Sequence, residues 1–235
     1  MVAAILSFGL QLAMVSTPPR VGTPRCDPRL SAAISDAKPS IFLDEDALLA
    51  EVDTGKLIDQ AKRFLSSRGG FGADPELLSE SFKFVGPVVG PLPKDAFVKA
   101  IGSVDLKAGF PDFQGEFYGF HVDPLEKNRV WYTARGYGTN TGPLPPFTTA
   151  ATGRSLVNPP QVCSLTFDDQ GLATKYTIGY VVDREVGNTG GLGGLYGVLY
   201  AIGKPLPFPE AQPWKMSKRY KLFQAIGNFM SRIAK

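Results

Sequence analysis

Four stretches rich in aromatic and β-branched residues follow one another in the second half of the chain, and they constrain the fold more than any other feature. They are Glu116–Val122, Arg129–Tyr137, Pro160–Phe167 and Leu172–Asp183. Such residues favour β-strands because they pack well on a pleated surface. The segments DPLEKN at 123–128 and DDQG at 168–171 have the residue types of hairpin turns. The pattern therefore predicts antiparallel strands joined by hairpins.

The residues before these strands predict helices. Over 41–68 the apolar residues recur at spacings near three and four, with acidic residues at the start and basic residues at the end, as the helix dipole favours. A Gly-Gly pair at 69–70 ends this pattern, and Gly55 is a candidate break within it. We expect a short helix at Pro75–Ser79, a strand at Ser81–Val85 and a second helix at Lys94–Val104. Helices gathered at one end of a mostly antiparallel sheet define an α+β fold.

The N-terminal segment does not share this patterning. Residues 1–16, MVAAILSFGLQLAMVS, are apolar and uncharged, and the segment after them is rich in Pro, Ser, Thr and Arg, with its first acidic residue at Asp27. A short apolar stretch is typical of a signal-peptide core, and a basic, hydroxylated segment is typical of an organelle transit peptide. In series they resemble the bipartite presequence of proteins sent to a secondary algal plastid. We therefore expect residues 1–38 to be a targeting presequence and the location to be the chloroplast; a disordered tail is the alternative.

The composition changes again after residue 185. Residues 187–203 hold seven glycines and residues 205–213 hold four prolines, which predicts an apolar, pliable strap. Residues 214–235 carry six basic residues and no acidic one, with apolar residues at helical spacing. Such a basic amphipathic helix is typical of contact with an anionic membrane surface, here through residues 191–235, or with an acidic protein partner. A terminal helix packed on its own domain is the alternative. The expected organisation is a domain at 41–185 followed by the strap and helix at 187–235.

Four short signatures in the domain resemble a known family. They are FxGP (Phe84–Pro87), FPD (Phe110–Asp112), GTNTG (Gly138–Gly142) and ATGR (Ala151–Arg154). Together with the order of elements they resemble the SnoaL-like polyketide cyclases of the nuclear transport factor 2-like superfamily. The resemblance covers about residues 41–185 and implies a cone, in which a curved sheet, a cystatin-like roll, wraps around the N-terminal helices and encloses a pocket. The superfamily holds both enzymes and binding proteins, so the fold alone does not choose an activity.

Two residues are candidates for the general base of an enolate-type cyclisation, dehydration or isomerisation, which needs a base and a hydrogen-bond donor for the oxyanion. Asp112 stands before a strand and His121 lies within one. The alternatives are a turn or cap carboxylate for Asp112 and a partly exposed strand residue for His121. Asn140 occupies the variable position of GTNTG, where SnoaL-like sequences commonly carry histidine; an amide cannot transfer a proton, so it orients or organises the turn.

Strand alternation groups the candidate ligand-binding residues. In one strand it places Glu116, Tyr118 and Phe120 on one face and Phe117, Gly119 and His121 on the other. In the next strand Trp131, Arg135 and Tyr137 share a face, where an arginine between aromatic rings can hold a polar ligand head. Arg135 as a surface residue paired with a carboxylate is the alternative. The candidate ligand-binding residues are Tyr118, Trp131, Tyr132, Arg135, Tyr137 and Asn140.

Composition excludes several classes of function. A net charge of +3 is too small to indicate nucleic-acid binding, and no apolar run reaches the roughly 20 residues of a membrane-spanning helix. Two cysteines and one histidine, without a cluster, predict no metal site, and no cofactor is expected. We expect a cone protein that binds an apolar or polyene-like small molecule, such as a pigment, in a non-catalytic binding or assembly role in a plastid; a homodimer is compatible with this. A cyclase, isomerase or dehydratase that uses Asp112 or His121 as base is the alternative.

Overall fold

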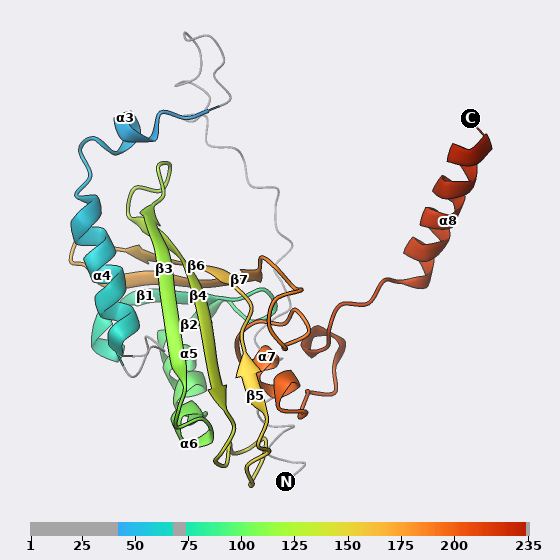
Figure 1. Ribbon diagram of the computed structural model, residues 1–235. Coiled ribbons are helices and arrows are strands. Elements are labelled where there is room, and N and C mark those ends of the chain that lie inside the picture. Colours follow the sequence, from blue (N-terminus) through green and yellow to red (C-terminus); the bar gives the residue numbers. More distant parts are fainter. Residues whose placement is uncertain (1–41, 68–73, 234–235) are drawn as a thin grey trace.

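The computed structural model describes residues 42–67 and 74–233, so the expected presequence at 1–38 lies outside the described residues. Within these ranges seven strands form one sheet, in the order β2-β1-β7-β6-β4-β3, with β5 paired to β4 (Figure 1). The strands are β1 (Leu78–Val85), β2 (Leu92–Pro93), β3 (Gln114–Val122), β4 (Arg129–Thr139), β5 (Ser155–Val157), β6 (Gln161–Phe167) and β7 (Ala173–Val181). The helices are α3 (Glu45–Leu49), α4 (Thr54–Ser66), α5 (Lys94–Gly102), α6 (Leu106–Gly109), α7 (Gly194–Ala201) and α8 (Lys218–Ile233), with 3₁₀ turns η2 (Pro75–Leu77) and η3 (Pro209–Ala211).

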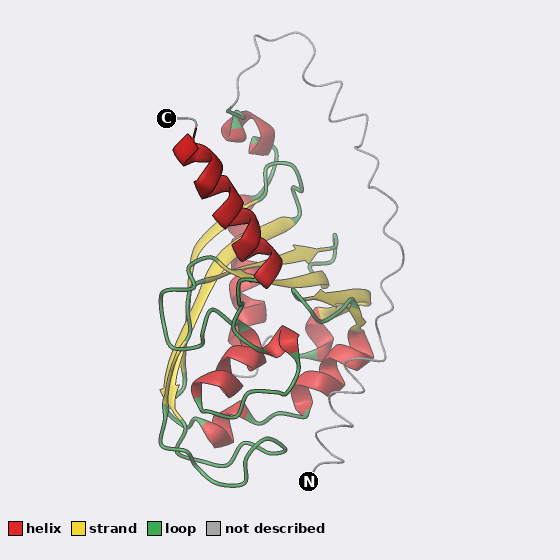
Figure 2. Cartoon of the chain, turned by 90° about the vertical axis from the view of Figure 1, so that its right-hand side faces the viewer, coloured by secondary structure: helices red, strands yellow, loops and turns green. Residues whose placement is uncertain are grey.

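The sheet is mostly antiparallel and strongly curved. Only the pairing of β1 with β7 is parallel; the other pairings are antiparallel. In Figure 1 the long strands β3 and β4 run steeply across β6, β7 and β1, so that the sheet curls into a half-barrel. Figure 2 shows long strands along one side of the body and other strands crossing it, with most helices gathered beside them. The α+β class with a curved sheet around helices, expected from the sequence, is confirmed.

Local chemistry explains where the predicted elements begin and end. The expected helix at 41–68 is two helices, because Asp53 caps the second one: its carboxylate accepts from the backbone N–H of Lys56 at 2.9 Å. The break thus precedes Gly55 by two residues. In both predicted hairpin turns an aspartate accepts backbone N–H groups that follow it, Asp123 from Leu125 and Asp168 from Gln170 and Leu172.

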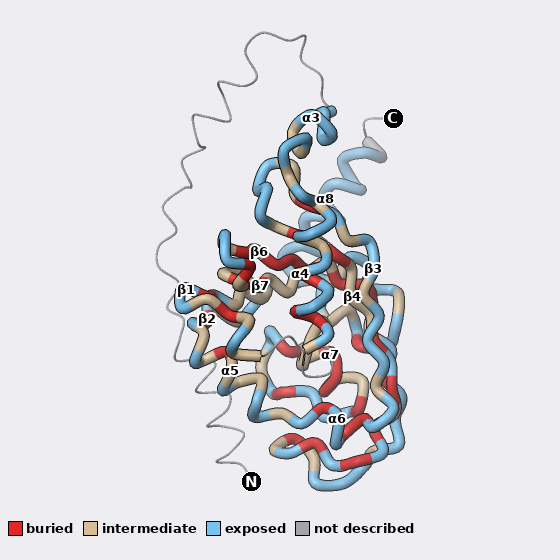
Figure 3. The backbone as a smooth tube through the Cα atoms, turned by 90° about the vertical axis from the view of Figure 1, so that its left-hand side faces the viewer, coloured by how far each residue is buried: buried red, intermediate tan, exposed pale blue. Residues whose placement is uncertain are grey.

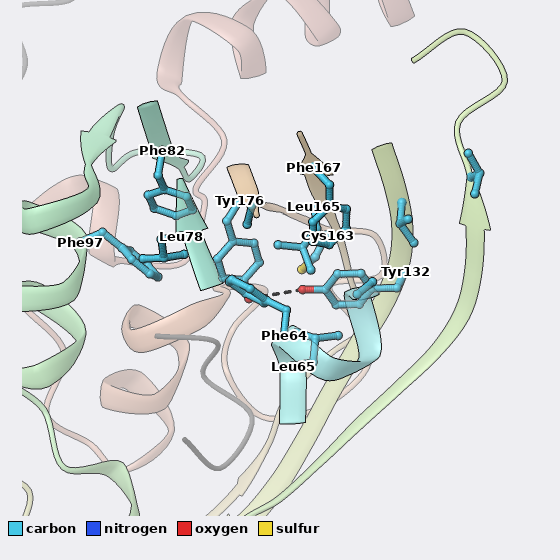
Figure 4. Close-up of a cluster of buried hydrophobic side chains, with 14 of the residues drawn as sticks. Phe64, Leu65, Leu78, Phe82, Phe97, Tyr132, Cys163, Leu165, Phe167 and Tyr176 are labelled. Carbon is cyan, nitrogen blue, oxygen red and sulfur yellow. Dashed lines mark hydrogen bonds between the residues drawn. The ribbon is translucent and has the colours of Figure 1, made fainter. Parts of the chain in front are cut away.

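The main core lies between the concave side of the sheet and helices α4 and α5; we call this space the cone interior. Figure 4 shows its side chains converging from α4, α5, β1, β4, β6 and β7. They include Phe64, Leu65, Leu78, Phe82, Phe97, Tyr132, Cys163, Leu165, Phe167 and Tyr176, all at most 6% exposed. The rings pack edge-to-face or stacked, with centroids of Phe84 and Phe97 5.0 Å apart. The chain's own aromatic residues therefore make up much of this core.

The glycine-rich strap forms a second core rather than a loose cover. Its helix α7 lies beside β5 in Figure 1, and Val198, Leu199 and Ile202 are at most 4% exposed. These side chains pack in one cluster with residues of α6, of the 144–147 turn and of β5. Glycine permits the close approach: a Cβ at Gly187 would lie 2.2 Å from the carbonyl oxygen of Val157. The strap is thus a packing element of the fold.

Helix α8 differs from every other helix in its surroundings. It projects away from the body in Figure 1, and the tube of Figure 3 is exposed along it. Residues 217–231 are all exposed, including six large apolar or aromatic side chains. No helix of the described residues is long and apolar enough to cross a membrane.

Candidate functional site

Among the described buried residues of the main core, the polar side-chain groups are two tyrosine hydroxyls and one thiol. The Tyr132 hydroxyl donates to the Tyr176 hydroxyl at 3.3 Å, and Cys163 lies beside them (Figure 4). Burial raises the pKa of the Cys163 thiol to about 11 and raises the pKa values of Tyr132 and Tyr176 as well. All three groups are protonated at neutral pH. They can donate hydrogen bonds, but they cannot take a proton from a substrate.

A β-bulge interrupts the alternation of β3. The pairing with β4 shifts register between Tyr118 and His121, so that β3 holds one extra residue there. Gly119 sits at this point with φ of +68°, a conformation that glycine adopts without strain. A glycine in the middle of a strand pattern is the sequence signal for such a bulge.

The bulge reverses the expected faces of β3 beyond Gly119. Phe117 and Phe120 both turn inward and contact the ring of Tyr132, at centroid distances of 5.9 and 5.4 Å. His121 turns outward, opposite Trp131 of β4. The prediction that placed Phe120 with Glu116 and Tyr118, and His121 with Phe117, is therefore wrong, because strict alternation holds only in a regular strand.

The remaining aromatic candidates lie on the outer face of β3 and β4. Only Tyr132 of the candidate ligand-binding residues lies in the cone interior within the described chain. The Arg135 Nε donates to the Tyr118 hydroxyl at 3.0 Å, and the Tyr137 hydroxyl donates to Gln114 Oε1 at 2.6 Å. Trp131 Nε1 donates to Asp123 Oδ2 at 2.7 Å. The structure thus divides the predicted set between two sides of the sheet, and the outer members are bonded to one another or to neighbouring residues.

Asp112 holds the end of β4. Both of its carboxylate oxygens accept from the backbone N–H of Thr139, at 2.8 and 3.0 Å. This is the backbone-capping arrangement named above as the alternative to a general base. Asp112 precedes β3 by two residues and His121 is the next-to-last residue of that strand, so they lie at opposite ends of β3. The two base candidates cannot act on the same substrate atom.

Asn140 organises the loop that contains the GTNTG and ATGR signatures. Its side chain is fully buried, and its amide NH₂ donates to the carbonyl oxygens of Gly109 and Gly142 at 2.9 and 3.0 Å. Its Oδ1 accepts from both the backbone N–H and the hydroxyl of Thr152, each at 2.8 Å. All four bonds are made, so Asn140 has no capacity left for a ligand. The side chain of Asn140 therefore links the GTNTG signature to Thr152 of the ATGR signature and has a structural role.

An open groove of about 400 Å³ lies between α3, the start of α4 and the end of β3. Its apolar lining consists of Leu49, Val52, Ile58, Phe120 and Val122, and its polar lining of Glu45, Asp46, Thr54 and His121. His121 Nδ1 lies 3.0 Å from the carbonyl oxygen of Gly119, which can only accept, so Nδ1 carries the proton of this bond. In the neutral ring Nε2 is then an acceptor. His121 is the one predicted site residue that the structure brings to this groove.

Sequence reasoning missed most of this groove. The periodicity of the α3 and α4 residues predicts a helix with one buried face. It does not show which strand that face packs against, so it does not predict the groove. Phe120 was assigned to the wrong face because of the bulge. The described residues contain no group of three or more His, Cys, Asp or Glu side chains that could hold a metal ion.

No protein-family model matches the chain, and no curated protein sequence matches it. Among solved structures it is similar to a protein from Jannaschia sp. CCS1 described as a SnoaL-like polyketide cyclase, with a TM-score of 0.45 and 19% identity over 65% of this chain and 95% of that chain. It is also similar to an NTF2-like protein of unknown function from Exiguobacterium sp. 255-15 (TM-score 0.36, 12% identity, 53% and 94% of the two chains). A third is the Δ5-3-ketosteroid isomerase from Mycobacterium sp. (0.36, 13%, 57% and 95%). At such identities and TM-scores these similarities assign no activity to this chain.

Proposed function

We propose that this protein is a non-catalytic cone protein that binds an apolar or polyene-like small molecule in the groove formed by α3, α4 and the end of β3. The observation that carries the proposal is the groove itself, in which five apolar residues lie beside four polar ones at the edge of the aromatic core. A volume of about 400 Å³ falls within the usual range for small-molecule sites. Contact with the apolar lining provides the favourable free energy of binding, because it removes ligand surface from water.

The polar rim restricts the chemistry of the ligand. Glu45 and Asp46 are exposed carboxylates among the residues that line the groove, and they repel an anionic ligand. The same carboxylates can accept hydrogen bonds from a hydroxyl group. The preferred ligand is therefore an uncharged apolar molecule with a hydroxyl end, and a carboxylate at that end weakens binding.

A matched pair of probes tests this preference. We expect the full chain to bind all-trans-retinol, measured by the change in its absorbance and fluorescence, and to bind all-trans-retinoic acid at least several-fold more weakly. Leu49→Asp should weaken retinol binding about 10-fold or more, because a buried apolar contact is replaced by a charge. Leu125→Asp, the same change at a site 54% exposed in the β3–β4 turn, is the control. Equal binding by the two variants would refute the groove as the site.

A specific observation supports the enzymatic alternative, a cyclase, isomerase or dehydratase. Of the two base candidates, His121 is the one that borders the groove, on the outer face of β3 opposite Trp131. If a substrate is turned over, His121→Gln should lower the rate about 100-fold and leave retinol affinity within a few-fold. Asp112→Asn should leave the rate unchanged, because that carboxylate is bonded to Thr139. An unchanged rate in His121→Gln would exclude His121 as the base.

We further propose a plastid location, with the apolar and then basic character of residues 1–38 as its support. The native protein is expected to begin between Cys26 and Ser40, where the fold-like patterning has not yet started. N-terminal sequencing of the protein from its host measures this directly. A mature chain that retains residues 1–16 would refute the presequence. Mass spectrometry of the same preparation would identify a co-purifying pigment or lipid.

A further inference from the structure

Helix α8 has an apolar face that no part of the described chain covers. Leu222, Phe223, Ile226, Phe229 and Met230 are 62, 71, 53, 63 and 60% exposed. At about 100° per residue their positions fall within one arc of the helix, roughly 120° wide. The opposite side carries polar residues of the same segment. Exposure of five large apolar side chains to water is unfavourable, and burial of this face against a partner would lower the free energy.

The charges of α8 specify what that contact must offer. Lys218, Arg219 and Lys221 stand in its first turn, and residues 211–235 contain no acidic residue. Basic residues at a helix N-terminus are unfavourable, because the dipole places partial positive charge there. The N-terminal end of α8 is therefore destabilised when nothing is bound to it. Contact with a negatively charged surface would stabilise this end, because it neutralises the basic side chains.

We propose that α8 lies in the surface of an anionic lipid membrane and holds the cone domain there. A helix with a broad apolar face, aromatic residues and basic residues gathered in its first turn suits the interface plane, where long basic side chains reach the headgroups. A second copy of α8 is a poor occupant of the apolar face, since pairing two acid-free helices brings only like charges together. A membrane needs no shape complementarity, and the linker at 212–217 separates α8 from the body (Figure 1). This inference is independent of the ligand proposed for the groove.

Vesicle co-sedimentation of the full chain tests the proposal. Vesicles of equimolar phosphatidylcholine and phosphatidylglycerol are compared with phosphatidylcholine alone, at low and at high salt. The protein should sediment with the anionic vesicles at low salt, and this binding should fall as salt screens the charges. The triple variant K218E/R219E/K221E should bind at least about 100-fold more weakly.

Two neighbouring residues provide a matched pair for the apolar face. Phe229→Asp and Asn228→Asp each add one negative charge, but only the first lies in the apolar arc. Phe229→Asp should weaken vesicle binding more than about 10-fold, and Asn228→Asp only about fivefold. Both side chains lie on an exposed helix, so the thermal unfolding of the domain should not change in either variant.

Four results would overturn the membrane assignment. The first is full-length protein that stays in the supernatant with anionic vesicles at low salt. The second is equal vesicle binding by Phe229→Asp and Asn228→Asp. The third is a dimer in sedimentation velocity without vesicles that Phe229→Asp dissociates, together with no vesicle binding; this would assign the face to a second copy. Capture of an acidic protein without vesicle binding would equally reject the membrane.

Discussion

Replacement of Asn140 by aspartate tests the structural role of the GTNTG signature with almost no change of shape. The amide NH₂ of Asn140 donates to the carbonyl oxygens of Gly109 and Gly142, at 2.9 and 3.0 Å, in a fully buried site. In Asn140→Asp an acceptor oxygen faces both carbonyls. The bonds from Thr152 to Oδ1 can remain. The substitution therefore removes two hydrogen bonds and adds a buried negative charge, while the packing volume stays the same.

The expected loss of stability follows from these contacts. The Gly142 carbonyl loses its donor, at a cost of about 1–3 kcal/mol. The Gly109 carbonyl keeps the backbone N–H of Gly142 at 3.2 Å and loses one of two bonds, at about 0.5–1.5 kcal/mol. Together this is roughly 2–4 kcal/mol before the charge is counted. For a chain of this size, each kcal/mol lowers the melting temperature by about 2–4 °C. A decrease on the order of 10 °C is expected near neutral pH. Since the site holds no cation, the pKa of the new carboxyl is raised in the folded state above its unfolded value.

The pH dependence gives the assay a second, independent readout. A carboxyl with a raised folded pKa binds its proton more tightly in the native state, so the destabilisation is present above the folded pKa and shrinks as pH falls toward the unfolded value. Thermal unfolding followed by circular dichroism should therefore show a smaller deficit at about pH 5 than at neutral pH. Asn228→Asp, the same change on the exposed face of α8, is the control. A melting temperature for Asn140→Asp within about 2 °C of the parent, at neutral pH, would refute the role assigned to Asn140.

Three further predictions concern the bulge, the buried thiol and the carboxylate at the end of β4. Gly119→Ala should cost about 1–2 kcal/mol in urea unfolding, because φ is +68°, whereas Gly119→Asn should cost less; equal stability of the three proteins would contradict this. Cys163 should resist iodoacetamide in folded protein carrying Cys26→Ser, and react on unfolding. The free energy of unfolding should also fall as pH rises from about 9 to about 11. The thiol of the unfolded chain ionises first, whereas the pKa of the thiol in the native protein is about 11. Rapid labelling of the native protein would contradict both the predicted resistance to iodoacetamide and this pH dependence. Asp112→Ala should lower the free energy of unfolding by about 1–3 kcal/mol, because the bonds to Thr139 are lost. Its affinity for retinol, measured as a control, should stay unchanged.

The elements that depend on neighbours in the chain could be predicted from the sequence. The two hairpin turns form where aspartate, asparagine and glycine were expected, because an aspartate accepts backbone N–H groups only a few residues away. The strands flanking these turns are within two residues of their predicted bounds. Helix α5 begins at Lys94, immediately after Pro93, as proposed. In each case the determining interaction spans a few residues.

Features of the site depended on contacts between distant segments. The choice of inward face in β3 follows from one extra residue at Gly119, whose effect appears only in the register with β4. The role of Asn140 follows from Gly109, which is 31 residues away. Asp112 was correctly placed before a strand, but its partner Thr139 is 27 residues away.

The sequence by itself determined the α+β class, the order of the strands along the chain, the hairpin turns and the amphipathic character of α8. These are properties of local spacing, and any fold of this chain must satisfy them. The tertiary structure alone decided that β1 and β7 pair in parallel, that the strap's helix α7 is buried against β5, and that aromatic rings make up much of the main core. The apolar faces of many distant segments look alike in the sequence, so the pattern alone does not determine which segments pack together. Only the packing of specific shapes, and the satisfaction of buried hydrogen bonds, selects one pairing among them.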